Sequence, residues 1–198
     1  MPRLIAHRGA AGTHPENTLV SFRAATAAGA EMLELDLWLA ADGVPVVIHD
    51  GTCRRTTGRD APVSALRAPD LAALDAGWAF SPDRGRSRPF RGAGHGVPAL
   101  REVLAALPGV RMVLEVKTPD PAVDAPLAAA LREGGAERRV LLASQSGPVL
   151  RRLRESFPGV PTSVGRDEVR AFLRRGWRAL PEAAGALQVP PRVLWRRL

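Results

Sequence analysis

Short apolar runs alternate with helical segments along most of the chain, and this order restricts its fold more than any other feature. Parallel strands need a crossover connection, usually a helix, whereas antiparallel strands can be joined by a tight turn. The alternation therefore indicates an α/β fold with a parallel sheet, open or closed. The strands are expected at residues 4–7, 32–38, 44–49, 110–116, 140–143, 160–163 and 186–189, and the helices at residues 16–28, 99–106, 122–133, 148–157 and 166–175.

Residues 50–96 interrupt the alternation as a loop-rich insertion. Residues 63–76 carry a short helical pattern, and residues 80–96, rich in glycine, proline and arginine, are expected to form a surface excursion. A chain of 198 residues with 45% hydrophobic and 24% charged composition is typical of one globular domain, so residues 1–198 are expected to form a single domain. Nucleotide-binding folds are disfavoured, because no glycine-rich phosphate-binding motif follows a strand.

The net charge of +8 is concentrated in residues 151–198, which hold eleven arginines against four acidic residues. We expect a solvated basic helix face, with peripheral contact to an anionic membrane surface as the alternative. Nucleic-acid binding is not expected, because no recognition motif, aromatic platform or zinc spacing accompanies the charge. On the helices, the outer faces are expected to carry Arg151, Arg152, Arg154, Arg170, Arg174, Arg175 and Arg178, and the inner faces Leu150, Leu153, Phe157, Val169 and Leu173.

The sequence carries no sign of a membrane span or a leader. No apolar run approaches the roughly 20 residues that cross a bilayer, and the chain reaches His7 before the apolar region of a signal peptide could form. The expected compartment is the cytoplasm. Cys53, the single cysteine, is expected to be a small buried filler.

Three carboxylates are expected on neighbouring strands. Glu34 and Asp36 are two residues apart, so their side chains point to the same face of a strand, and Glu115 lies near the end of another strand. Like charges held this close require a cation, and oxygen ligands without cysteines or paired histidines suit Mg²⁺ or Ca²⁺. The sequence therefore predicts a metal site at these residues, with a solvated strand-edge carboxylate as the alternative for Glu34.

Two histidines, His7 and His49, each close an apolar run. A histidine at a strand end is often structural, but two of them beside three carboxylates favour an acid and base pair. Asp50 could either orient His49 or cap the next turn. The other two histidines, His14 and His95, lie in expected loops and are expected to be solvated.

Lys117 is the single lysine beside 27 arginines, so a generic cation in this chain is an arginine. A compact ammonium suits an oxygen that moves or changes charge during a reaction, whereas the planar fork of an arginine suits static bidentate contacts. We therefore predict a functional role for Lys117, and we expect Arg8 to bind a phosphate.

These residues lie in motifs that resemble the glycerophosphodiester phosphodiesterase family in order and spacing, over about residues 3–189. Residues 74–78 and 90–92 resemble its lysophospholipase D branch. The motifs are His7-Arg8-Gly9, Pro15-Glu16-Asn17-Thr18, Glu34-Leu35-Asp36, residues 42–50, Arg55-Thr56-Thr57-Gly58, Val97-Pro98-Ala99-Leu100 and Leu114-Glu115-Val116-Lys117.

The resemblance implies a TIM-type (β/α) barrel that hydrolyses a glycerophosphodiester to glycerol 3-phosphate and an alcohol, with lysophospholipids as substrates in the lysophospholipase D branch. Carried over by motif, the three carboxylates hold the metal, the two strand-end histidines are the acid and the base, and Arg8 and Lys117 hold the phosphate and its developing charge. In the route proposed for the family, the substrate's own glycerol hydroxyl attacks phosphorus, and water then opens the resulting cyclic phosphate.

The chain departs from the family pattern in two places. Ser144-Gln145-Ser146 stands where the family has Ser-Phe after the fourth barrel strand. The sequence also ends after about six of the eight βα units, so the last two units are expected to be absent and the barrel incomplete. An open barrel exposes its interior and its strand edges, so we expect marginal stability or closure by self-association. The alternative to an active enzyme is a catalytically impaired remnant or a lipid-surface binding module.

Overall fold

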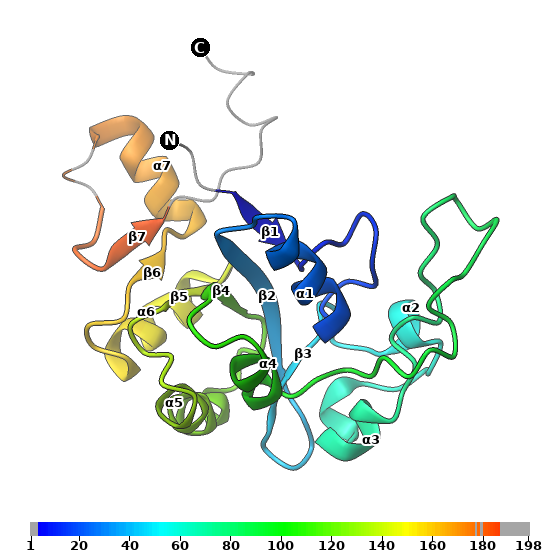
Figure 1. Cartoon of the computed structure of the whole chain (residues 1–198). Coiled ribbons are helices and arrows are strands. Elements are labelled where there is room, and N and C mark those ends of the chain that lie inside the picture. Colours follow the sequence, from blue (N-terminus) through cyan, green and yellow to red (C-terminus); the bar gives the residue numbers. More distant parts are fainter. Residues whose placement is uncertain (1–3, 177, 179, 187–198) are drawn as a thin grey trace.

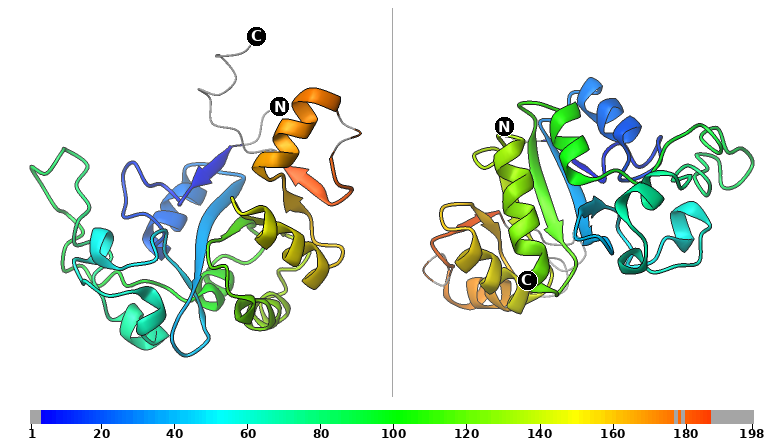
Figure 2. Two further views of the ribbon diagram at one scale, coloured as in Figure 1. Left: turned by 180° about the vertical axis from the view of Figure 1, so that it is seen from behind. Right: turned by 90° about the horizontal axis from the view of Figure 1, so that it is seen from below.

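The computed structural model of the protein describes residues 4–176, 178 and 180–186. Its parallel sheet curls into part of a barrel, and helices cover the outer face (Figures 1 and 2). Within the described residues the sheet does not close, because no strand pairing joins its two ends. The fold is an incomplete TIM-type barrel. The strand order is β1 (Ile5–His7), β2 (Met32–Leu39), β4 (Arg111–Val116), β5 (Val140–Ala143), β6 (Thr162–Ser163) and β7 (Ala184–Ala186).

The helices lie close to the positions expected from the sequence. Of the strand expected at residues 186–189, only residue 186 is described; it belongs to β7, and residues 187–189 lie outside the described residues. The longer helices are α1 (Leu19–Ala27), α4 (Leu100–Ala106), α5 (Asp124–Glu133), α6 (Gly147–Ser156) and α7 (Arg166–Arg175).

One face of the sheet packs against the helices, and the other lines the barrel interior. On β2, Leu33, Leu35 and Leu37 are fully buried in the main core between the sheet and its helices. The alternate residues of the strand face the barrel interior, where a small apolar cluster formed around Val113 and Leu141 lies below the carboxyl ends of the strands. Strand alternation therefore places polar side chains above this cluster, at the rim where barrel enzymes bind their substrates.

One strand does not follow the expected parallel order. β3 (Pro45–Val47) pairs with β2 in the antiparallel sense and lies off the barrel path. The turn at Asp42 and Gly43, with φ +75° at Gly43, sends the chain back along β2, and Ile48 donates to the carbonyl of Asp36 at 3.0 Å. This hairpin, and not a parallel strand end, returns the chain to the rim just before His49.

The insertion at residues 50–96 forms a lobe beside the sheet, on the side away from α6 and α7 (Figures 1 and 2). It contains α2 (Arg54–Thr57), the 3-10 turn Val63–Ala65 and α3 (Ala68–Ala72), and residues 80–96 form turns without helix or strand. A second core cluster, which includes Cys53, Val63 and Leu71, lies under this lobe. The lobe is thus packed onto the barrel, and Cys53 is buried as expected.

The sequence predicts that the arginines of α6 lie on its outer face, and this prediction is wrong for two of them. Arg152 and Arg154 have side chains only 20% and 16% exposed. Arg152 pairs with Asp124 of α5 at 3.1 Å, and Arg154 makes two hydrogen bonds to Glu168 of α7. These two guanidinium groups therefore join helices, and the basic surface is smaller than the sequence predicts.

The apolar residues of the same helices differ between α6 and α7. Leu150 and Leu153 of α6 are buried, as is Phe157 directly after it, which confirms the expected inner face. Leu173 of α7 is 64% exposed, so the prediction that it faces inward is wrong, and no residue of α7 is buried. α7 lies at the β7 end of the sheet, where fewer described elements pack against it (Figure 1).

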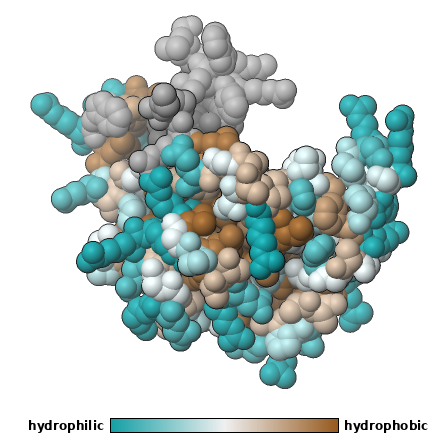
Figure 3. Space-filling model, viewed as in Figure 1, coloured by the Kyte–Doolittle hydropathy of each residue, from teal (hydrophilic) through white to brown (hydrophobic). Residues whose placement is uncertain are grey.

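Apolar surface is visible in the middle of the face seen in Figure 1, between hydrophilic side chains that project at its sides (Figure 3). The large hydrophobic residues exposed in the described part of the chain are Leu4, Ile5, Trp78 and Leu173. Leu4 and Ile5 lie at the β1 end of the open sheet. Over the residues described, no helix has both the length and the apolar character to cross a bilayer.

Candidate active site at the barrel rim

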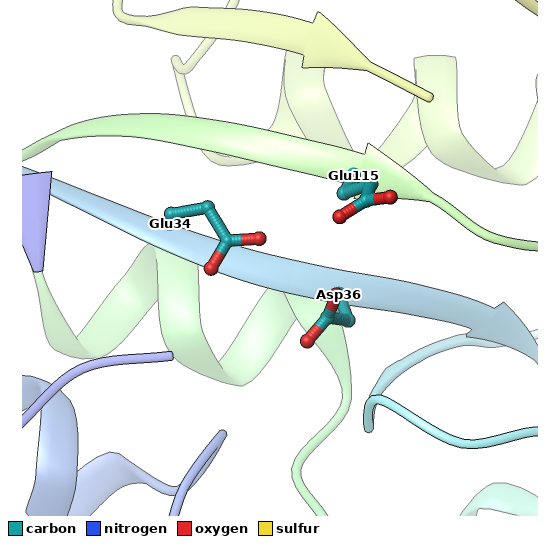
Figure 4. Close-up of side chains that lie close together, drawn as sticks. All are labelled: Glu34, Asp36 and Glu115. Carbon is teal, nitrogen blue, oxygen red and sulfur yellow. The ribbon is translucent and has the colours of Figure 1, made fainter. Parts of the chain in front are cut away.

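Three carboxylates from two neighbouring strands converge at the rim. Glu34 and Asp36 project from the same face of β2, and Glu115 is the register partner of Asp36 on β4 (Figure 4). Their exposed fractions are 4%, 0% and 9%, and one oxygen from each lies within 4.8 Å of the others. The structure thus brings together the three residues that the sequence predicts as metal ligands.

The cluster carries more negative charge than its surroundings balance. Burial, reinforced by the charge of Asp36, raises the pKa of Glu34 to about 7. The buried Oδ1 of Asp36 and Oε1 of Glu115 contact only an ammonium group as an ion pair and accept no hydrogen bond of good geometry. Three buried carboxylates, two of which carry an oxygen without a hydrogen bond, form a donor set that fits a hard divalent cation such as Mg²⁺ or Ca²⁺.

Lys117 supplies that ammonium group. It follows β4 directly, and its Nζ lies 2.9 Å from Glu115 Oε1 and 3.1 Å from Asp36 Oδ1. Although burial acts in the opposite direction, the contacts with Glu115 and Asp36 raise the pKa of Lys117. Lys117 therefore stays charged and places one cation directly above two of the three carboxylates.

Arg8 approaches the cluster from the other side. Its backbone adopts φ +57°, and its amide donates to Glu34 Oε2 at 3.0 Å. The side chain places Nε 3.4 Å from Asp36 Oδ2 as an ion pair. This buried Nε has no hydrogen-bond partner. A guanidinium with an unused donor beside an acidic cluster is suited to a phosphate oxygen.

His7 ends β1 beside the cluster, with Nε2 3.8 Å from Glu34 Oε2. Partial burial and the Arg8 guanidinium lower the pKa of His7, and its side chain is 70% exposed. The ring is therefore accessible to a substrate at the rim.

His49 reaches the rim from the insertion side, after β3. Its Nδ1 lies 2.6 Å from Asp50 Oδ1, and the indole of Trp38 donates to its carbonyl at 3.0 Å. Of the two roles that the sequence leaves open for Asp50, this contact favours orientation of His49. Trp38 also packs against Gly51, where an added Cβ would lie 3.0 Å from the ring.

Asn17 is a site residue whose role the sequence pattern alone does not indicate. Its Nδ2 donates to Asp36 Oδ2 at 2.8 Å, and its Oδ1 accepts from the Asp36 amide at 3.4 Å. Asn17 adopts φ +57°, a conformation that asparagine tolerates better than most residues. The signal was present in the Pro15–Thr18 motif, but nothing in its spacing indicates which strand it contacts.

The remaining histidines lie elsewhere. His14 and His95 flank Phe90, with ring centroids 5.2 and 5.7 Å from it. Both are half-buried, so the expectation that they are solvated is wrong. The rings belong to the packing of the insertion against the first loop of the chain.

The chain matches one protein family over most of its length. The profile described as the glycerophosphoryl diester phosphodiesterase family matches residues 7–171. A glycerophosphodiester phosphodiesterase from Caldanaerobacter subterraneus is 32% identical over 160 residues, covering 78% of this chain and 63% of that protein. Three curated relatives are matched over only 57% to 63% of their own lengths.

Solved structures show the same likeness. A glycerophosphodiester phosphodiesterase from Agrobacterium tumefaciens superposes with a TM-score of 0.81 at 31% identity, covering all of this chain and 80% of that one. An Oleispira antarctica phosphodiesterase, solved with the product sn-glycerol-3-phosphate, gives a TM-score of 0.71 at 27% identity, covering 82% and 65%. From its sequence match and its fold, the chain belongs to the glycerophosphoryl diester phosphodiesterase family.

Proposed function

We propose that the protein hydrolyses glycerophosphodiesters to glycerol 3-phosphate and an alcohol, and that this reaction depends on Mg²⁺ or Ca²⁺. The observation that carries the proposal is the buried cluster of Glu34, Asp36 and Glu115, flanked by Arg8 and Lys117. The product bound to the Oleispira antarctica relative supports the choice of substrate class. A lysophospholipid, whose phosphodiester has the same chemistry, is the larger substrate to be tested.

The three carboxylates would hold the divalent ion, which supplies Lewis-acid stabilisation of charge on the phosphoryl oxygens when it is bound. The Arg8 guanidinium, which lies beside the cluster, would bind a phosphate oxygen, and Lys117 would neutralise negative charge as it develops. Because the rim is otherwise acidic, these two cations also determine where an anionic substrate can approach.

The two histidines would move the protons. Asp50 contacts Nδ1 of His49 at 2.6 Å and so orients the ring, and we assign His49 to protonate the leaving alkoxide. In the same step His7 takes the proton of the glycerol hydroxyl as that oxygen attacks phosphorus. In the second step the roles reverse: His49 takes a proton from water, and His7 returns one to the glycerol oxygen as the cyclic phosphate opens.

The test is release of glycerol 3-phosphate from glycerophosphocholine by purified protein with Mg²⁺ or Ca²⁺. We expect His7→Ala and His49→Ala each to lower kcat on the order of 10²-fold or more. His14→Ala is the matched control, because His14 packs on Phe90 away from the carboxylates. If folded wild-type protein with metal turns over neither this substrate nor a lysolipid, the proposal is overturned. The alternative of a catalytically impaired remnant is then favoured.

The arrangement of the chain carries further proposals of smaller scope. Residues 1–198 act as one domain, in which the insertion at 50–96 forms one side of the site.

The exposed Leu4 and Ile5 at the open edge favour self-association, which analytical ultracentrifugation tests directly. The arginines left on α6 and α7 favour a peripheral contact with anionic membranes, and binding to anionic vesicles that weakens with salt is its test. A cytoplasmic location is tested by fractionation.

A further inference from the structure

We propose that Arg55 is a positioning residue that links the acid–base side of the site to its phosphate-binding side. The inference rests on the proposed function, because it assigns Arg55 a role in the same reaction. Arg55 lies on α2 of the insertion and touches none of the three carboxylates of the cluster.

The geometry is that of a two-sided clamp. Arg55 Nε donates to Asp50 Oδ2 at 2.6 Å, while its Nη1 and Nη2 donate to the two carboxylate oxygens of Glu16 at 2.8 and 2.7 Å. All three nitrogens of the guanidinium therefore donate a hydrogen bond to one of the two carboxylates. A lysine cannot reproduce this contact, because its single ammonium lacks the planar fork.

Each carboxylate that accepts a hydrogen bond from Arg55 also contacts a residue of the site. The other oxygen of Asp50 holds His49 Nδ1 at 2.6 Å. Oε1 of Glu16 is also the acceptor for Arg8 Nη1 at 3.1 Å, and Arg8 Nε faces Asp36 at 3.4 Å. An unbroken series of contacts thus runs from His49 through Arg55 to Arg8.

The charges agree with this arrangement. Although burial acts in the opposite direction, hydrogen bonds from Arg55 lower the pKa values of Glu16 and Asp50. Hydrogen bonding to Glu16, reinforced by Asp50, raises the pKa of Arg55. All three groups stay ionised at neutral pH, so the clamp persists over the range in which a histidine pair works.

The segment that carries Arg55 is anchored to the core. Cys53, directly before α2, is fully buried, and Thr57 Oγ1 donates to its carbonyl at 2.8 Å. Gly58 ends the helix at φ +75° against the ring of Trp78. A short helix held at both ends can fix a side chain that bridges 39 residues of sequence, from Arg55 back to Glu16.

Stability alone does not explain the contact. The Arg55 side chain is 46% exposed, so solvent screening limits what the pair contributes to folding. Its neighbour Arg54 shows what an ordinary surface pair looks like in this helix: it is 75% exposed and lies 4.0 Å from Asp60. Arg54 is therefore the matched control, since it differs from Arg55 by one position and by the absence of a link to the site.

The experiment measures kcat and KM for glycerophosphocholine with Arg55→Gln, Arg55→Lys, Asp50→Asn and Glu16→Gln, with Arg54→Gln as control. We expect Arg55→Gln to lower kcat on the order of 10-fold to 100-fold and to raise KM. Asp50→Asn changes mainly kcat, because it disturbs the contact with His49. Glu16→Gln changes mainly KM, because it disturbs the contact with Arg8. Arg55→Lys gives no rescue, and Arg54→Gln matches wild type.

A second readout does not need turnover. The nitrogen and ring-proton NMR signals of His49, one of four histidines, report whether Asp50 still holds its Nδ1. We expect Arg55→Gln to shift these signals and Arg54→Gln to leave them unchanged, with the same thermal unfolding for both variants. An inactive wild type would contradict the proposed function and leave this readout to decide the role of Arg55. Unchanged His49 signals in Arg55→Gln, or full activity in Arg55→Lys, would overturn the inference.

Discussion

Replacing Lys117 with methionine should destabilise the metal-free protein and do so far less when a divalent ion is present. The substitution keeps an unbranched, flexible side chain one atom shorter and removes the ammonium that contacts Asp36 and Glu115 at 3.1 and 2.9 Å. Asp36 is fully buried and Lys117 only 14% exposed, so the two carboxylates would lose a partner that solvent cannot replace. Removing one member of a buried ion pair costs about 3 to 5 kcal/mol.

We expect the lower end, about 3 kcal/mol, because Arg8 and Asn17 still contact Asp36. For a chain of this size 1 kcal/mol shifts Tm by about 2 to 4 °C, so Tm should fall by about 6 to 12 °C in a chelator. A bound Mg²⁺ or Ca²⁺ supplies the missing positive charge, and the gap between variant and wild type should then shrink.

The assay is thermal unfolding of both proteins in EDTA and in saturating Mg²⁺ or Ca²⁺. Arg111→Met is the matched control, because Arg111 begins the strand that Lys117 follows and forms an exposed pair with Glu31 at 3.8 Å. Such a pair is worth about 0 to 1 kcal/mol, with no dependence on the metal. A Lys117→Met gap of equal size with and without metal would refute the reasoning that the cluster binds a cation.

Three further predictions follow from single residues. Because the pKa of Glu34 is raised to about 7, metal binding must displace its proton at lower pH, and we expect the metal affinity measured by calorimetry to fall about 10-fold from pH 8 to pH 6; equal affinities would contradict it. Hydrogen bonding to Arg154 lowers the pKa of Glu168, so its contribution to stability is present above the unfolded-state pKa and is lost as pH falls through the folded-state value; Glu168→Gln should therefore flatten the acid side of a urea-unfolding profile, and an unchanged profile would exclude this role. Gly9→Ala should cost about 2 kcal/mol or more in the free energy of unfolding, because Gly9 adopts φ +80° and an added Cβ would lie 2.5 Å from Ser21 Oγ; Gly12→Ala, which meets nothing within 4 Å, is the control, and equal costs would refute the argument.

The architecture could be read from the sequence because β1, β2, β4 and β5 are compact apolar runs separated by helical segments. The direction of β3 could not be read from periodicity, which identifies a strand but not its partner. Asp42 and Gly43 nevertheless form a short hairpin signal between two strands, and this signal outweighs the parallel order there. The same hairpin explains why His49 reaches the rim although it does not end a barrel strand.

The candidate site was predictable where its chemistry follows from local spacing. Glu34 and Asp36 share a face because they are two residues apart on one strand, and the single lysine is conspicuous by its type. The roles of Asn17 and Arg55 depend on contacts 19 and 39 residues away, which only the folded chain defines. The same limit explains the arginines of α6, since their partners lie on other helices.

The central claim is that the three buried carboxylates bind a divalent ion needed to cleave a phosphodiester. Its most direct test is glycerol 3-phosphate release from glycerophosphocholine by chelator-treated protein during titration with Mg²⁺ or Ca²⁺, comparing wild type with Glu115→Gln. We predict no turnover without metal, saturable recovery in the wild type, and recovery in Glu115→Gln only at higher metal concentration. Full turnover in the chelator, or identical titrations for the two proteins, would contradict the account.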